Sequence, residues 1–176
     1  MTEPVSQVRV RVARASDEAQ LARLDRVSWS PRSGFPSVMQ QAGTVFFLTE
    51  SPPQAFLVAE IDGVMVGYIR LGSPLPLPEN AHVMGVLGLA VAPDARRRGV
   101  ATALLTAAER RARARGARKL SLRTFSTNPE AIRLYTSFGF EREGLLRAEF
   151  LIEGQYVDDL LLAKDLTGSP ANGAVG

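Results

Sequence analysis

The chain has 176 residues, of which 45% are apolar and 22% charged, a composition typical of a soluble globular protein with one core. It has no cysteine, which excludes disulfide frameworks, thiolate metal sites and cysteine nucleophiles. Its single histidine, His82, argues against a zinc enzyme or a Ser-His-Asp hydrolase, so no metal is expected. No apolar stretch approaches the roughly 20 residues of a membrane span, and a signal peptide is missing. We therefore expect a cytoplasmic protein that binds no membrane.

The first predicted elements are a short strand and a helix. Valines alternate with arginines from Val8 to Val12, which predicts a half-buried strand with the valines inward. Ser16 precedes two acidic residues and is predicted to cap a helix that runs to Ser28.

A hairpin and a central strand are predicted next. Asp62 and Gly63 are a two-residue turn signal between apolar runs at 55–61 and 64–71. The run from His82 to Val91 is apolar at successive positions, which predicts a central strand covered on both faces.

A parallel crossover is predicted from the segments that follow. Apolar positions within 99–115 recur with helical spacing, and Gly116 is a natural stop for that helix. The strand predicted at 119–125 comes immediately afterwards. Strand, helix and strand in this order predict a right-handed crossover, which would set 82–91 and 119–125 parallel to each other.

The last predicted elements are a helix and a hairpin. An asparagine N-cap and a first-turn proline predict a helix over 128–139. Apolar segments at 140–152 and 155–164 flank a Glu-Gly turn and predict a hairpin. Residues 1–166 are therefore expected to form one domain, and 167–176 a flexible tail.

Positive charge is concentrated in one segment. The chain carries a formal charge of +3, but residues 96–119 hold nine basic residues and one acidic residue, which leaves −5 elsewhere. Such a segment indicates an anionic ligand. The basic helix 100–118 could equally present a solvated face, or bind nucleic acid, although no aromatic residues are interleaved with its arginines.

The loop before this helix has the features of an anion site. Pro93 ends the preceding strand, and Gly99 opens a helix whose first turn has free N–H groups and the positive end of the dipole. Gly99 and Ala101 leave space for an anion near the backbone, and Arg96 and Arg98 add charged donors. A pyrophosphate would fit, but a strand-to-helix turn with exposed arginines would have the same sequence.

Two motifs in this part of the chain resemble a known family. Arg96-x-x-Gly99-x-Ala101 matches the pattern Gln/Arg-x-x-Gly-x-Gly/Ala, and the segment 128–135 is followed by Phe-Gly-Phe at 138–140. In these motifs the chain resembles the GCN5-related N-acetyltransferases (GNAT), which bind acetyl-CoA, over residues 8–165. The resemblance implies an α/β (α+β) GNAT fold: a mixed sheet of about seven strands, flanked by helices, with splayed central parallel strands.

The resemblance also implies where acetyl-CoA binds. In the family the pantetheine arm inserts between the splayed strands, here 82–91 and 119–125, and satisfies strand backbone groups that lack a ladder partner. The cofactor-binding residues implied are Leu89, Ala90, Val91, Arg96, Arg97, Arg98, Gly99, Val100, Ala101, Thr102, Asn128 and Tyr135. Asn128 would serve equally well as a plain helix N-cap.

The catalytic residues are less completely implied. Tyr135 resembles the family tyrosine that protonates the departing thiolate, although it could instead be a packed aromatic. Many members have a glutamate on the strand equivalent to 82–91, whereas this strand has no carboxylate. His82 and Glu79, at its entrance, are candidate bases, with a structural role for His82 and a water relay as the alternatives.

The implied activity is transfer of an acetyl group from acetyl-CoA to a primary amine by direct attack. The acceptor is a small molecule, a protein N-terminus or a lysine, with walls expected at 26–54 and 72–84, including aromatics such as Trp29, Phe35 and Phe46. Two alternatives remain: a member that binds the cofactor without catalysis, and a nucleic-acid-binding domain. No nucleic-acid partner is expected. The acceptor, the base, the preferred acyl chain and the oligomeric state are left open, a homodimer being common in the family.

Overall fold

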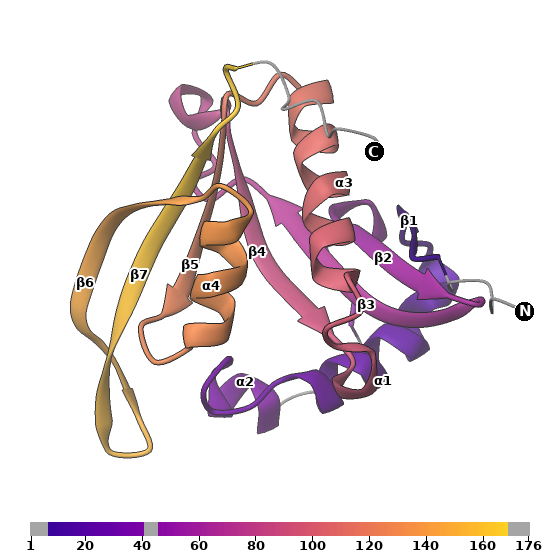
Figure 1. The fold of residues 1–176 in the computed structure, drawn as a ribbon, viewed down its shortest axis with the longest axis horizontal. Coiled ribbons are helices and arrows are strands. Elements are labelled where there is room, and N and C mark those ends of the chain that lie inside the picture. Colours follow the sequence, from indigo (N-terminus) through magenta and orange to yellow (C-terminus); the bar gives the residue numbers. More distant parts are fainter. Residues whose placement is uncertain (1–6, 41–45, 169–176) are drawn as a thin grey trace, which may run out of the picture.

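The computed structural model describes residues 7–40 and 46–168 (Figure 1). Seven strands form one sheet in the order β1-β2-β3-β4-β5-β7-β6. The strands are β1 (Arg9–Val12), β2 (Phe56–Ile61), β3 (Val64–Gly72), β4 (Val83–Val91), β5 (Lys119–Phe125), β6 (Glu141–Ile152) and β7 (Gln155–Asp165). The α-helices are α1 (Glu18–Ser28), α2 (Pro36–Gln40), α3 (Val100–Ala114) and α4 (Pro129–Ser137), and the 3-10 helices are η1 (Ala15–Asp17), η2 (Pro53–Ala55), η3 (Pro78–Asn80) and η4 (Pro93–Ala95).

Helices cover both faces of this sheet (Figure 1). Helices α3 and α4 pack on one face, where the predicted apolar stripe of α3, including Leu104 and Ala108, is fully buried against residues such as Leu120 of β5. Helix α1 packs on the other face, where its Leu21 and Leu24 meet side chains of β2 and β3. Within the described residues, no helix combines the length and the apolar character needed to cross a membrane. The mixed α/β architecture predicted from the sequence is confirmed.

Strand β1 forms one edge of the sheet and pairs only with β2. Its valines alternate as predicted, and Val8 and Val10 pack against the core. Val12, the last residue of the strand, shares their face but is 44% exposed, so the predicted half-buried face is not covered at this position.

The start of α1 differs from the prediction. Asp17, rather than Ser16, is the N-cap, and it makes no cap hydrogen bond to the helix. Its carboxylate instead accepts bonds from the Arg11 guanidinium at 2.7 and 3.0 Å and from the Arg14 amide at 2.7 Å. Arg11 also donates to Glu60 at 2.8 Å, so one guanidinium joins β1, β2 and the turn before α1. A long-range ion pair therefore holds this helix end.

Both predicted tight turns are present. Asp62 and Gly63 have φ of 51° and 78°, and Glu153 and Gly154 have φ of 50° and 80°. Two successive residues with positive φ match the right-handed twist of the flanking strands, which is why such pairs close hairpins. The pairs β2–β3 and β6–β7 are accordingly antiparallel, as predicted.

Strand β4 is fourth of the seven strands and pairs antiparallel with β3 and parallel with β5. The parallel crossover is therefore confirmed. The expectation that β4 is covered on both faces is wrong at Leu87, which is 44% exposed. The ladder with β3 is shifted between Arg70 and Leu71, and Leu87 is the extra residue of the resulting bulge.

The basic helix α3 uses its middle arginines in packing. Arg113 pairs with Glu109 at 2.9 Å and donates to the carbonyl of Leu166, while Arg111 donates to the carbonyl of Gln54. These contacts give Arg111 and Arg113 a structural role, whereas Arg110 and Arg115 are exposed. The predicted tail at 167–176 lies outside the described residues from 169 onward.

We predict that Asp17→Asn lowers the free energy of unfolding by about 2 kcal/mol, the typical value of hydrogen bonds to a charged group. The Arg11 guanidinium, and to a lesser extent the Arg14 amide, outweigh burial and hold the pKa of Asp17 below its ordinary 3.8. A lowered pKa means that the stabilisation is complete above the pKa of the unfolded aspartate and is lost as the pH falls through the folded pKa. Urea unfolding should therefore show a gap between wild type and variant at neutral pH that closes in acid.

The exposed Glu50 is the matched control for this test. Glu50→Gln makes the same carboxylate-to-amide change away from any buried pair, so its unfolding curve should overlay the wild type. Equal stability of Asp17→Asn and wild type at neutral pH would contradict the assignment.

Candidate active site

The site begins where β4 and β5 stop pairing. Their parallel ladder joins Val83–Val86 to Lys119–Leu122 and then ends. Strand β4 continues to Val91 and β5 to Phe125, and the two strands diverge over these residues (Figure 1). The splayed parallel strands expected from the sequence are therefore present.

The ladder between β3 and β4 decides which backbone groups face the opening. The amide of Ala92 donates to the carbonyl of Val66 at 2.8 Å, which fixes the phase of this antiparallel ladder. Because successive residues alternate in direction, Leu89 and Val91 turn their N–H and C=O groups away from β3, whereas Ala90 turns its groups toward β3. Of these three predicted cofactor contacts, two offer their backbone to the opening.

The N-terminus of α3 lies beyond the end of β4. Gly99 is the N-cap, with φ of 78°, and no side chain caps the helix. The first intrahelical bond runs from the Ala103 amide to the Gly99 carbonyl, which leaves the N–H groups of Val100, Ala101 and Thr102 free. A Cβ built on Gly99 would meet nothing within 4 Å. This terminus is thus an open cradle of amides with a favourable dipole for anions.

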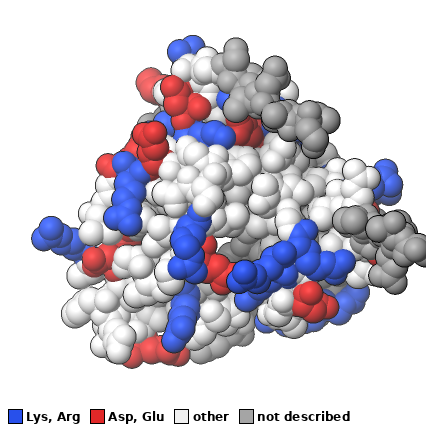
Figure 2. Space-filling model, viewed as in Figure 1, with Lys and Arg blue, Asp and Glu red and all other residues white. Residues whose placement is uncertain are grey.

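The three loop arginines do not have equivalent surroundings. The Arg96 guanidinium donates to the carbonyl of Ser28 at 3.0 Å and to that of Val91 at 3.4 Å, so it joins the end of α1 to the end of β4. Arg97 and Arg98 are exposed. Figure 2 shows Lys and Arg side chains around this end of α3, next to a hollow in the surface. Arg96 is exposed as well, but its guanidinium is bonded to the protein, so Arg97 and Arg98 supply the uncommitted charge.

Tyr135 comes from α4, on the same face of the sheet as α3. It is 8% exposed, and its ring packs edge-on against the ring of Phe140, with the two centroids 5.8 Å apart. Burial raises the pKa of Tyr135 to about 12, so the hydroxyl keeps its proton at neutral pH. Within the described parts of the chain, no group hydrogen-bonds this hydroxyl. A buried, protonated phenol of this kind can act as a proton donor.

Asn128 forms the N-cap of α4. Its side-chain oxygen accepts a bond from the Ala131 amide at 3.1 Å, and Pro129 occupies the first turn. The capping role foreseen as one alternative is thus observed. The amide nitrogen of Asn128 can still donate to a ligand beside the end of β5.

His82 lies at the wrong end of β4 for a role at the splay. It is exposed, and it precedes Leu89 by seven residues, which is about 23 Å along a strand. Its carbonyl accepts bonds from the amides of Arg118 and Lys119, a structural function at the start of the sheet. Glu79, in η3, lies at the same end. Neither expected base reaches the opening between the strands.

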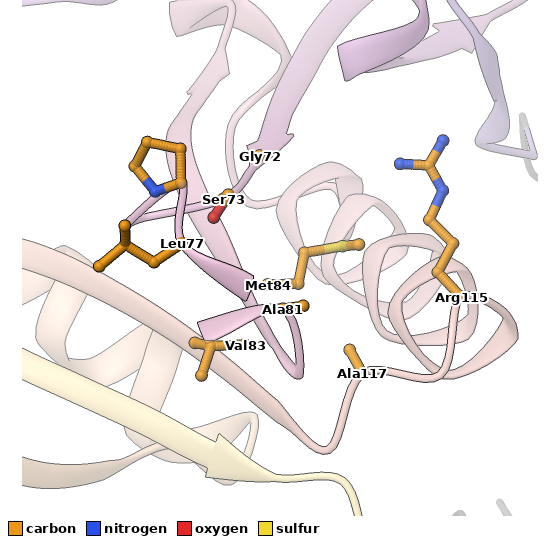
Figure 3. Close-up of a pocket in the computed structure, with 9 residues that line it drawn as sticks. Gly72, Ser73, Leu77, Ala81, Val83, Met84, Arg115 and Ala117 are labelled. Carbon is orange, nitrogen blue, oxygen red and sulfur yellow. The ribbon is translucent and has the colours of Figure 1, made fainter. Parts of the chain in front are cut away.

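A cavity of about 300 Å³ occupies that far end (Figure 3). Ser73 and Leu77 line one wall, Arg115 stands on the other side, and Met84 lies between them. The segment 72–84, expected to line the acceptor site, therefore borders this cavity and lies away from the N-terminus of α3. Segments 72–84 and 96–99 are separated because they flank opposite ends of β4.

Only part of the second expected acceptor wall, 26–54, lies next to β5 and β6, on the open side of the splay. Phe35 packs edge-on against Phe125 of β5 and Phe150 of β6, with centroids at 5.1 and 4.8 Å. A cavity of about 410 Å³ lies between α2 and the β6–β7 hairpin, beside these rings. Trp29, Phe46 and Phe47 instead pack against the core under α1. Residues 41–45 of this wall lie outside the described residues.

One residue near the opening was not anticipated. Arg70 of β3 is half-buried and pairs across the ladder with Gly88 of β4, next to Leu89. The only sequence signal was a single charge in the otherwise apolar strand 64–71.

Comparison with known proteins agrees with this geometry. A model of the acetyltransferase (GNAT) family matches residues 19–140. Acetyltransferase SG1711 of Sodalis glossinidius is 36% identical over 105 residues, which cover 58% of this chain and 70% of that protein. A GCN5-related N-acetyltransferase from Kribbella flavida has a TM-score of 0.75 and 26% identity over 90% of this chain and 97% of its own.

A further solved structure shares the fold alone, because its sequence identity is low. It is yncA, a putative acetyltransferase from Salmonella typhimurium with its cofactor acetyl-CoA, with a TM-score of 0.73 and 20% identity over 96% of this chain and 99% of that one. The family model matches more than half of the chain and includes the splayed strands, the glycine-capped helix and Tyr135. The chain therefore belongs to the acetyltransferase (GNAT) family and is an acetyltransferase.

Proposed function

We propose that this protein transfers the acetyl group of acetyl-CoA to a primary amine by direct attack of the amine on the thioester. The observation that carries the proposal is the early end of the β4–β5 ladder, which leaves the N–H groups of Leu89 and Val91 and the carbonyl of Leu89 without a strand partner beside an uncapped helix N-terminus. An elongated amide-containing arm with a diphosphate at one end matches both features.

The residues of the cradle fit the diphosphate. Free amides at Val100, Ala101 and Thr102 would bind its oxygens, and the accessible guanidinium groups of Arg97 and Arg98 would add charge-assisted bonds. Arg96 would act indirectly, since its guanidinium already holds the Val91 carbonyl and the end of α1. Asn128 would donate to the arm from the β5 side. Acetyl-CoA supplies the activated acyl group.

Tyr135 would act as the proton donor to the departing thiolate. Its pKa, raised by burial, keeps the hydroxyl protonated, and its position on α4 sets it on the cofactor side of the splay. One free N–H of β4, that of Leu89 or that of Val91, would donate to the carbonyl oxygen of the thioester.

Removal of the amine proton is assigned to water. A free alkyl amine has a pKa of about 10 and must lose a proton before attack. Strand β4 has no carboxylate, and Gly85, Leu87 and Gly88 occupy its middle. His82 lies at the opposite end of that strand, so a side-chain base on β4 is not part of the proposal.

We predict that Gly99→Val weakens acetyl-CoA binding at least ~100-fold, because the branched side chain would fill the space between the amides and the diphosphate. Isothermal titration calorimetry would measure this. Gly116→Val is the matched control: Gly116 has φ of 77°, against 78° for Gly99, and equally open surroundings, but it lies at the other end of α3. Gly116→Val should have the same unfolding stability as Gly99→Val and the same affinity for acetyl-CoA as the wild type. Retained affinity in Gly99→Val would refute the cradle.

We predict that Tyr135→Phe lowers kcat at least ~10-fold, within the usual range for loss of a general acid, and leaves the Kd of acetyl-CoA unchanged. Thiol release measured with a chromogenic disulfide gives the rate. Tyr156→Phe, which removes the hydroxyl of a tyrosine that is 74% exposed, should have no effect. Unchanged turnover of Tyr135→Phe would remove this residue from the mechanism.

A further inference from the structure

The two faces of the sheet divide the reactants. The diphosphate cradle and Tyr135 lie on the face covered by α3 and α4. An amine that attacks the thioester between β4 and β5 must therefore approach from the other face, which α1 and α2 cover. The side chains that β3 and β4 turn toward α1 and α2 are the ones that meet the acceptor.

The cover of this face ends beside the opening. Tyr68 of β3 and Ala90 of β4 are 5% and 4% exposed under α1. One step further along the same face the pair is Arg70 and Gly88, and beyond it lies Leu87, which is 44% exposed. The face thus changes from buried aromatic packing to open space over Gly88 and an exposed leucine at the level of Arg70.

Arg70 is the charged group at this boundary. Its side chain is half-buried, and the only atom near a Cβ built on Gly88 is the Arg70 Cβ at 4.0 Å, so the space over Gly88 is open. Leu89, whose backbone faces the splay, follows Gly88 directly. Arg70 therefore starts from the strand position opposite Gly88, one residue from Leu89, within side-chain reach of the place where the acyl group would lie.

Two carboxylates of α1, on the same face of the sheet, are engaged by other donors. Asp25 accepts the hydroxyl of Tyr68 and, at 2.6 Å, the indole N–H of Trp29. Glu18 accepts the backbone amides of residues 46 and 47. Throughout residues 7–40 and 46–168, Arg70 makes no ion pair and no hydrogen bond. A partly desolvated guanidinium without an anion is unfavourable, and its planar fork matches a carboxylate in two bonds.

We propose that Arg70 binds the carboxylate of the acceptor, and that the acceptor is an α-amino acid whose amine is acetylated. In an α-amino acid the carboxylate and the amine are on the same carbon, so an anion held over Gly88 keeps the nitrogen close to an acyl group at Leu89. The inference rests on the proposed function and adds the class of acceptor.

The proton balance of this reaction leaves the carboxylate unchanged. The amine nitrogen forms a bond to the acetyl carbon as the carbon–sulfur bond breaks. The ammonium group loses two protons in becoming an amide. One is released to water, and the other replaces the proton that Tyr135 gives to sulfur. Arg70 holds the substrate and transfers nothing.

The test compares amino acids with their carboxamides, which keep the amine and the side chain but lack the negative charge. Thiol release from acetyl-CoA would be measured for a panel of L-amino acids and the matching carboxamides with the full chain. We expect at least one amino acid to exceed its carboxamide ~10-fold or more in kcat/KM. In Arg70→Met that advantage should disappear through a rise in KM for the acid, with the carboxamide rate within ~2-fold of wild type.

Controls separate this result from a general loss of structure. Arg110→Met removes an exposed arginine of α3 and should keep the preference for the acid. Arg70→Lys should recover part of the preference, because it restores charge without the planar fork. If Arg70→Met is poorly folded, the wild-type comparison still decides whether the acceptor is an amino acid, and Arg70→Lys tests the role of the residue.

Three outcomes would overturn the inference: wild type acetylates carboxamides or simple amines as well as amino acids, it acetylates no amino acid, or Arg70→Met lowers the rates of acid and carboxamide equally. The proposed function would stand without this acceptor class if other amines are acetylated, or if Arg70→Met affects acid and carboxamide equally. Failure of wild type to bind acetyl-CoA in calorimetry would instead count against the proposed function itself.

Discussion

The early end of the β4–β5 ladder is the constraint on which the rest of the site depends. Four residue pairs, from Val83 to Val86 on β4, hold the two parallel strands together, and the strands then separate. Unpaired backbone groups are unfavourable unless another partner satisfies them, which is why the opening suits the amide-containing ligand proposed for it. The bulge at Leu87 occurs at the same level and sets the phase of the residues beyond it.

The elements around the opening are held by contacts between distant parts of the chain. Lys164 of β7 donates to Glu109 of α3 at 2.7 Å and to the carbonyl of Phe138 at 3.0 Å, which ties α3 and α4 to the sheet. On the other face, Arg96 connects the end of α1 to the end of β4. Arg96 makes its contacts at the splayed end of β4, whereas Lys164 lies opposite Leu120, where β4 and β5 are still paired.

The basic segment 96–119 has more than one function. Arg111 and Arg113 pack α3 against neighbouring segments, and Arg96 fixes the loop, while Arg97 and Arg98 remain accessible next to the helix N-terminus. A high local charge in the sequence therefore overstates the charge available to a ligand. Arg70 is the opposite case. It is a single half-buried arginine in the otherwise apolar strand β3, and its isolation in the sequence marks its position more clearly than the cluster marks any one of its arginines.

The sequence by itself determined most of the helices and strands, the crossover and the glycine-containing loop before α3. These depend on local signals: turn pairs such as Asp62-Gly63, the helical spacing within 99–115, and Gly99 at a position that requires positive φ. Only the tertiary structure decided what surrounds each residue. It exposed Leu87, engaged Arg96 with Ser28, and left Arg70 opposite Gly88, next to the opening. Strand pairing, its phase and the cover by distant helices set these environments, and none of them is encoded in neighbouring residues.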